Sequence, residues 1–234
     1  MVYRKNLIKR RKTFFERRSL TELIILANFF AFFAFFIIFW IFGKSDPEKL
    51  ISYFALNPSY FSKGYVWTIF TSMFLHVGFA HLFVNMISMF FIGNFVEKLI
   101  GKKRYLWFYF ISGIVAGLFF VGLAYVGQYI PYGDSLFGDV NAFALGASGS
   151  LFGLGGLLAV LIPRLKVLIF FIIPMPLWLG MTLLMFGLWA VSFSAGLPIG
   201  NTAHFGGLIV GLIYGFYIRN KYSRKVRMLN KMFK

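Results

Sequence analysis

The sequence contains no cysteine and few charged residues. Without cysteine, disulfide bonds, thiolate metal sites and cysteine nucleophiles are excluded. Only 13% of the 234 residues are charged, against about a quarter in a soluble globular domain. By contrast, 59% are hydrophobic and 33 are phenylalanine. A water-soluble fold could not bury that much apolar surface, so we expect the lipid bilayer to surround most of the chain.

Acidic residues are also scarce, with 7 Asp and Glu against 24 Lys and Arg, which gives a formal net charge of +17. Such a charge is compatible with nucleic-acid binding, but the basic residues lie at the ends of apolar runs and almost never inside them. That distribution is typical of membrane topology signals. We therefore expect no nucleic-acid partner.

Apolar runs and the residues that interrupt them predict six spanning helices, each close to the roughly 20 residues that a bilayer requires. The expected spans are Leu23–Phe42, His81–Val96, Tyr105–Val126, Leu145–Ile162, Pro176–Phe193 and Ala203–Ile218. The first run is too long for the apolar core of a signal peptide and has no small-residue cleavage site, so it is read as a span. The apolar stretch Val167–Ile173 is expected to extend the fifth span or to lead into it.

The basic residues predict the orientation of these spans. If the N-terminus is cytoplasmic, the segments 1–22, 97–104, 163–166 and 219–234 lie inside and hold 21 of the 24 Lys and Arg. This asymmetry follows the positive-inside tendency and places both termini in the cytoplasm. The fold class is thus all-α and polytopic, with a basic segment at 1–22, a six-helix domain at 23–218 and a basic tail at 219–234.

Among the polar residues inside the expected spans, four stand out: His81, Asn85, Ser148 and His204. Polar groups at membrane depth are costly and often mark a functional site. The predicted topology brings all four to one depth near the outer face. Two stripes of small residues suggest close packing between the fourth and sixth spans. They are Ser148, Gly155 and Ala159, and His204, Gly207, Gly211 and Gly215.

These residue types suit acyl transfer. A serine hydroxyl becomes a nucleophile when a neutral imidazole within hydrogen-bond reach accepts its proton. Asn85, His81 and the backbone N–H of Ser148 could donate to the oxyanion of a tetrahedral intermediate. Because no acidic residue lies in the outer half of any expected span, the sequence favours a Ser148–His204 dyad over a triad. No metal or cofactor is expected.

The residues that carry this chemistry resemble the motifs of the rhomboid family of intramembrane proteases. Gly146 to Gly149 reads GASG and resembles the rhomboid GxSG motif, His81 and Asn85 resemble the oxyanion motif HxxxN, and Ala203-His204 with Gly207 and Gly211 resembles the sixth-helix signature. GxSG alone also resembles the nucleophile elbow of soluble α/β-hydrolases, but that elbow requires a strand-turn-helix that this sequence does not offer. The resemblance runs from about Trp67 to Gly215.

The resemblance implies a six-helix bundle of the basic prokaryotic form in the cell membrane, with the site facing outward. It implies cleavage of single-pass membrane proteins in or beside their spanning segment, without a cofactor. Phe152 matches an aromatic position that packs on the histidine, the fifth helix with Trp178 would be a lateral gate, and Ser194–Asn201 would cap the site. Many rhomboids carry Trp-Arg in the first outer loop, whereas this chain has Trp67-Thr68.

Two alternatives stay open at this point. A non-proteolytic rhomboid-like protein would bind membrane clients without cleaving them, although inactive relatives typically lack the serine or the histidine. A small channel or transporter would need polar residues along a path across the whole bilayer, whereas those found here stop in the outer half. The sequence leaves the natural substrate and the oligomeric state undetermined.

Overall fold

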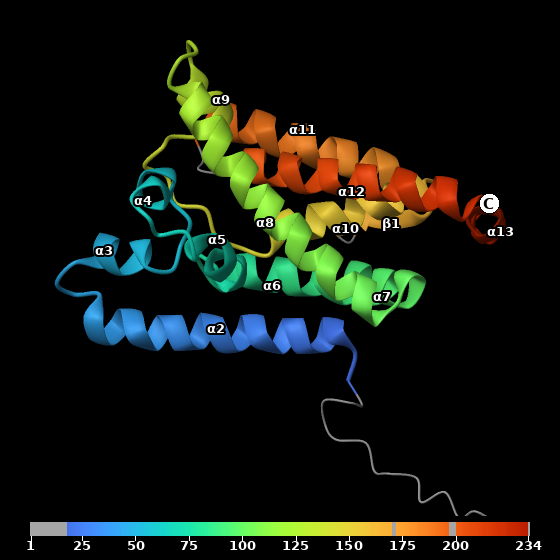
Figure 1. Ribbon diagram of the computed structural model, residues 1–234, viewed down its shortest axis with the longest axis horizontal. Helices are drawn as coiled ribbons and strands as arrows, with labels where there is room; N and C mark the ends of the chain where they lie inside the picture. Colours follow the sequence, from blue (N-terminus) through green and yellow to red (C-terminus); the bar gives the residue numbers. More distant parts are fainter. Residues whose placement is uncertain (1–17, 170–171, 197–199, 234) are drawn as a thin grey trace, which may run out of the picture.

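The structure is a computed structural model, and it describes residues 18–169, 172–196 and 200–233. Most of the basic segment 1–22 and the centre of the expected cap at 194–201 therefore lie outside the described residues. The prediction of an all-α polytopic membrane protein is confirmed, because apolar helices make up most of the described chain (Figure 1).

Six long helical segments form the bundle, and they match the six expected spans. They are α2 (Leu20–Phe42), the continuous run of α6 (Phe79–Ser88), η2 (Met89–Gly93) and α7 (Asn94–Ile100), α8 (Lys102–Gly127), α10 (Ser148–Leu161), α11 (Leu177–Ala195) and α12 (Asn201–Lys221). Four of these segments are long and apolar enough by themselves to cross a membrane: α2, the Phe79–Ile100 run, α8 and α11. The other two, α10 with 14 residues and α12 with its glycines, lie against each other within the bundle.

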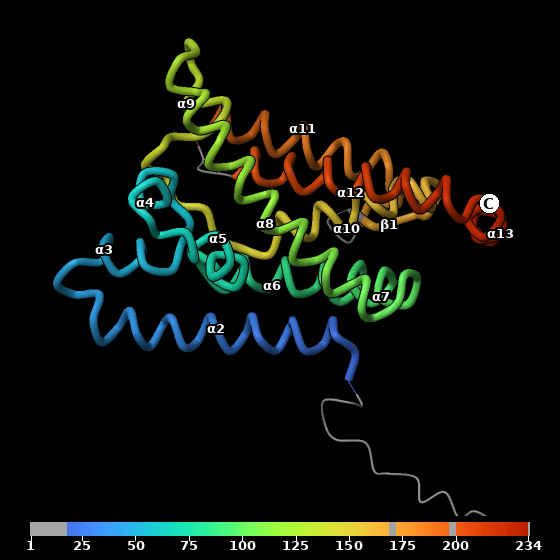
Figure 2. The backbone as a smooth tube through the Cα atoms, viewed as in Figure 1, coloured from blue at the N-terminus to red at the C-terminus, as the bar shows by residue number. Residues whose placement is uncertain are grey.

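Successive long segments run in opposite directions along the bundle, as Figure 2 shows. The start of α2, the junction between α7 and α8, and the ends of α10 and α12 lie at one end of the molecule. Most of the basic residues of the described chain lie at that same end, which is the distribution the charge pattern predicts. The start of α10 and the start of α12 lie toward the opposite end.

Helix α10 occupies the centre, and nearly all of its residues are buried. It packs closely on α12 because glycines remove the side chains that would separate the two backbones. A Cβ on Gly207 would collide with the carbonyl oxygen of Gly149, and one on Gly211 would collide with that of Gly153. The α12 stripe is thus as predicted, but the α10 stripe is not, because Gly155 instead faces Met181 of α11.

The shift in the α10 stripe has a simple cause. Ser148 is the first residue of α10, and side chains in a helix lean toward its N-terminus. The Ser148 side chain therefore approaches α12 from just before the residues at which the two helices touch. The line of contact runs one residue later in phase, through Gly149 and Gly153. The predicted stripe, which has the helical phase of Ser148, therefore lies on a different face of α10 from the one that packs on α12.

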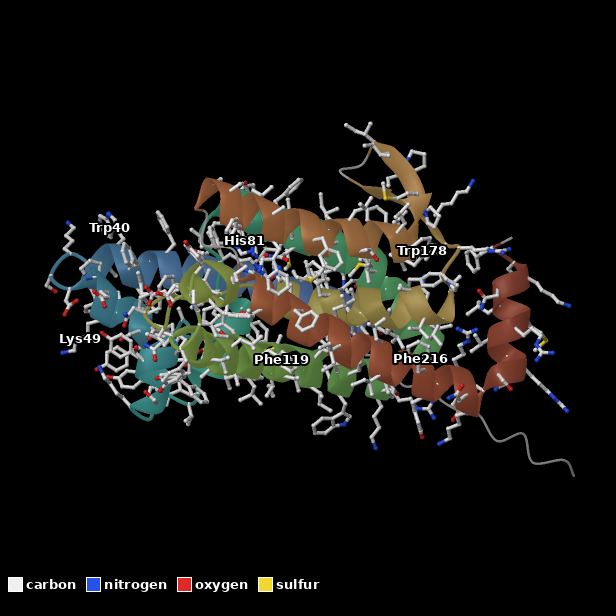
Figure 3. The ribbon with its side chains drawn as sticks, turned by 90° about the horizontal axis from the view of Figure 1, so that it is seen from above. Trp40, Lys49, His81, Phe119, Trp178 and Phe216 are labelled. Atoms are coloured by element: carbon white, nitrogen blue, oxygen red, sulfur yellow. The ribbon has the colours of Figure 1, made fainter. Side chains whose placement is uncertain are left out.

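The stretch Val167–Ile173 leads into the fifth span, which is one of the two expected alternatives, but its described residues form a β-hairpin and not a helical extension. Strand β1 (Lys166–Ile169) pairs antiparallel with β2 (Ile173–Pro176), with Lys166 opposite Pro176. Val, Leu and Ile favour extended backbone, and Pro174 and Pro176 cannot continue a helix. The hairpin projects from the bundle beside the start of α11 (Figure 3).

The connection from Gly43 to Tyr65 is folded rather than extended. It contains α3 (Pro47–Ser52) and α4 (Pro58–Ser62), and it is followed by α5 (Thr68–Thr71) and the short 3-10 helix η1 (Ser72–Phe74). The indole N–H of Trp67 donates to the carbonyl of Tyr53, and the hydroxyl of Thr68 donates to that of Tyr65. Trp67 and Thr68, which stand where many rhomboids have Trp-Arg, therefore each stabilise this loop with a side-chain hydrogen bond.

Glu97 lies at the basic end of the bundle, where its basic neighbours in the sequence favour an ion pair with Lys or Arg. It lies buried in α7 and instead accepts hydrogen bonds from the backbone N–H groups of Leu20 and Thr21 and from the Thr21 hydroxyl. A carboxylate at a helix N-terminus satisfies free N–H groups and complements the helix dipole. Glu97 therefore ties the first spanning helix to the second.

Candidate active site

Ser148 and His204 lie together although 56 positions separate them in the chain. His204 occupies the first turn of α12, and its Nε2 lies 2.8 Å from the Oγ of Ser148, the first residue of α10. The glycine contacts between α10 and α12 bring the two helices close enough for this hydrogen bond. His204 is buried and Ser148 is half-buried, so the pair is shielded from bulk solvent on most sides.

The histidine ring is held in place by Phe152, one turn after the serine. The two rings stack with their centroids 4.5 Å apart and an interplanar angle of 16°. Stacking fixes the orientation of the imidazole plane, so Nε2 stays directed at Ser148. The resemblance to the rhomboid family implied this contact between Phe152 and the histidine.

His81 and Asn85 approach the serine loop from α6. A Cβ on Gly146 would lie 3.0 Å from Nε2 of His81 and 3.6 Å from Nδ2 of Asn85. Gly146 has a φ of +126°, a conformation that strongly favours glycine, and its N–H donates to the carbonyl of Ser72. A glycine is thus required here twice, for the backbone turn and for the close approach of the two side chains.

The side-chain amide of Asn85 is an unused donor. Its nitrogen is buried and has no hydrogen-bond partner in the described chain, which is rare because such a group costs about 1–3 kcal/mol. The N-terminus of α10 adds further donors, since no side chain caps its first turn. Together these N–H groups surround the start of α10 and suit a ligand that carries negative charge on oxygen.

No carboxylate assists the histidine in the described structure. The Nδ1 of His204 is buried without a partner there. Asp139 instead accepts the backbone N–H of Asn141 within the loop before α10, and Asp134 lies in the short helix α9 (Gly133–Phe137). Groups of His, Cys, Asp and Glu that could hold a metal ion are likewise absent from the described residues.

His76 is the neighbour that the sequence did not connect with the site. It lies in the turn before α6, is buried, and packs edge-on against His81 with ring centroids 5.0 Å apart. Burial, and to a lesser extent the adjacent His81, lower the pKa of His76 to about 3, so its ring is neutral at physiological pH. The only sequence signal for this contact was the five-residue spacing between the two histidines.

Helix α11, which the resemblance assigns as the lateral gate, packs against α10 and α12. Helix α11 is fully buried only at Leu177, Gly180, Met181 and Met185, all of which lie in its first half. Trp178 is half-exposed in its first turn, near the hairpin and away from His81 (Figure 3). The indole of Trp189 donates to the carbonyl of Leu136, which links the outer part of α11 to α9.

Comparison with known proteins supports the assignment suggested by these residues. The Rhomboid domain family model matches residues 63–221. The chain is 32% identical over 171 residues to Rhomboid protease GluP of Bacillus subtilis, covering 72% of this chain and 29% of that protein. It is 31% identical over 154 residues to Rhomboid protein 1, mitochondrial, of Saccharomyces cerevisiae, covering 64% and 41%.

A third relative is named as inactive. The chain is 39% identical over 77 residues to Inactive RHOMBOID-like protein 8 of Arabidopsis thaliana, covering 33% of this chain and 22% of the relative. The chain thus spans less than half the length of each of these three relatives. The matched segment nevertheless includes every residue of the cluster around Ser148. The chain is an integral membrane protein and belongs to the rhomboid family.

Proposed function

We propose that the chain is an intramembrane serine endopeptidase that uses Ser148 as nucleophile and His204 as general base. The observation that carries this proposal is the 2.8 Å contact between Ser148 Oγ and His204 Nε2, with the imidazole stacked on Phe152. Membership of a family that contains proteases provides independent support.

The chemistry proceeds in two halves. As Ser148 Oγ attacks the scissile carbonyl carbon, His204 Nε2 accepts the hydroxyl proton, and the carbonyl oxygen becomes an oxyanion. Asn85 Nδ2, the ring N–H of His81 and the N–H of Ser148 stabilise that charge. His204 then donates its proton to the leaving amine. Water deprotonated by His204 attacks the acyl-enzyme carbon and releases the acid product with regeneration of the serine.

The proposed substrates are single-pass membrane proteins, cleaved in or beside their spanning segment. A substrate of this kind would approach from the lipid, and α11, which the resemblance assigns as the lateral gate, is fully buried only in its first half. The resemblance implies a prokaryotic cell membrane, and the charge asymmetry favours an orientation with the site toward the outer side. The lipid bilayer is then the second partner of the protein.

The second candidate is a client-binding protein without protease activity. It is suggested by the relative named as inactive. The four residues His81, Asn85, Ser148 and His204 are nevertheless all present and close together, which favours the protease. The two candidates differ in whether Ser148 is nucleophilic.

A serine-reactive fluorophosphonate probe separates them. We expect the purified protein to be labelled at Ser148, and labelling to disappear in Ser148→Ala. In Ser150→Ala labelling should persist, because the Ser150 hydroxyl already donates to the carbonyl of Tyr109 and does not contact His204. A folded protein that resists labelling would favour the client-binding candidate.

A further inference from the structure

A second concave site lies at the end of the bundle opposite Ser148. It is a cavity of about 290 Å³ between the end of α10, the end of α12 and the short helix α13 (Ser223–Lys231). Its walls include apolar Val160, Pro163 and Val226, and polar Ser223 and Asn230. Two arginines, Arg219 and Arg227, complete the lining. At about 30 Å³ per water molecule, the volume corresponds to roughly ten waters and suits a phosphodiester headgroup.

Both arginines are exposed, and neither has a hydrogen bond or an ion pair within the described part of the chain. The sequence also contains no Asp or Glu after Asp139, so the C-terminal part of the chain supplies no acidic side chain to neutralise them. Of the acidic residues on neighbouring elements, Glu97 is engaged at the N-terminus of α2. The cavity therefore offers two unpaired guanidinium groups, which bind phosphate oxygens in a bidentate manner.

The cavity lies where lipid headgroups would be. Helix α13 crosses the end of the bundle at a steep angle to the long helices (Figure 3), as an interfacial helix does. Nearby, Arg104 lies over the ring of Tyr222, and Lys221 donates to the hydroxyl of Tyr217. Tyrosine and basic side chains of this kind are enriched at the membrane–water interface.

The position of α13 is fixed by contacts with the bundle. The side-chain amide of Asn230 donates to the carbonyl of Leu161, the last residue of α10, and the ring of Phe233 meets that of Phe95. The cavity is consequently bounded on two sides by helices that are held together. Arg219 in α12 and Arg227 in α13 are therefore both on helices whose positions are fixed.

From these observations we propose that the cavity binds the headgroup of an anionic phospholipid, with Arg219 and Arg227 holding its phosphate. The apolar walls at Val160, Pro163 and Val226 would accommodate the beginning of the acyl chains. This site is separate from the Ser148 cluster, so its test does not depend on protease activity.

The test is a titration of the purified full chain with dioleoyl phosphatidylglycerol and with dioleoyl phosphatidylcholine, followed by native mass spectrometry. We expect tighter binding of phosphatidylglycerol. The double variant Arg219→Gln/Arg227→Gln should bind it roughly thirtyfold more weakly, at about fivefold for each basic residue. The matched control Arg224→Gln/Lys225→Gln removes the same charge from α13 outside the cavity lining, and should retain the parent affinity.

Several results would overturn the proposal. They are equal binding of the two lipids, an unchanged affinity in the cavity variant, or an equal loss in the control, which would indicate a diffuse charge effect. Displacement of the lipid by excess inorganic phosphate would point to a soluble anion instead. Thermal unfolding shows whether each variant is folded. If the double variant is unstable, the single variants Arg227→Gln and Arg224→Gln repeat the comparison. We then expect about a fivefold loss of affinity for phosphatidylglycerol in Arg227→Gln and no loss in Arg224→Gln.

Discussion

The contact between Gly207 and the Gly149 carbonyl provides a sharp test of how the helices position the site. In Gly207→Ala the new Cβ would collide with that carbonyl oxygen, which belongs to backbone and cannot rotate away. To restore an ordinary van der Waals distance, α10 and α12 would have to separate by more than about 1 Å. Because Ser148 lies on α10 and His204 on α12, that movement would lengthen their 2.8 Å contact.

A displacement of about 1 Å at a catalytic group can lower the rate roughly 10²-fold. We therefore expect Gly207→Ala to lose about two orders of magnitude in kcat/KM toward a reporter membrane substrate. The overpacked interface should also cost about 1–3 kcal/mol of stability. The assays are cleavage kinetics and thermal unfolding in the same detergent.

Gly122→Ala is the matched control, because a Cβ at this position in α8 would meet no atom within 4 Å. It should keep full activity and gain about 0.5–1 kcal/mol, since alanine is the better helix former. If Gly207→Ala retained the activity of Gly122→Ala, close packing of α10 on α12 would not be what brings the serine and the histidine together.

Three further predictions follow from individual contacts. Asn85→Ala should lower kcat about 10²–10³-fold by removing an oxyanion donor. Its melting temperature should hold or rise, because the amide nitrogen has no partner to lose; a large fall in stability with unchanged kcat would contradict the assigned role. Phe152→Leu keeps an apolar side chain but removes the ring stacked on His204, so kcat should fall about tenfold for roughly 1.4 kcal/mol of lost positioning, with KM little changed. Equal kcat in the two proteins would show that stacking is unimportant. Glu97→Gln should destabilise the protein by about 1–3 kcal/mol, since a neutral amide replaces the carboxylate that accepts three hydrogen bonds from Leu20 and Thr21. Lys98→Gln, the adjacent control, should change the unfolding curve little.

The sequence predicted the architecture because membrane solvation leaves few choices. Apolar runs of fixed length and the positions of Lys and Arg are local features, and they located all six long segments. The cluster was accessible for a related reason. Once the topology is set, the four site residues must lie at a similar depth in the membrane: His81, Asn85, Ser148 and His204. The spacings within the motifs then determine which faces of the helices they occupy.

What the sequence did not predict depends on side-chain packing between distant elements. Glu97 accepts hydrogen bonds from residues 76 and 77 positions away, and charge alone favoured a nearby cation instead. The α10 stripe was misassigned by one residue because the serine does not lie on the line of contact. The β1–β2 hairpin was missed because a short apolar stretch has the same composition as the end of a spanning helix.

The most direct test of the central claim is cleavage of a single-pass reporter substrate by the purified protein reconstituted in liposomes. The wild-type protein should release two fragments, and both Ser148→Ala and His204→Ala should abolish cleavage while keeping the wild-type thermal unfolding profile. Cleavage that survives Ser148→Ala in the folded protein would contradict the assignment of this serine as the nucleophile.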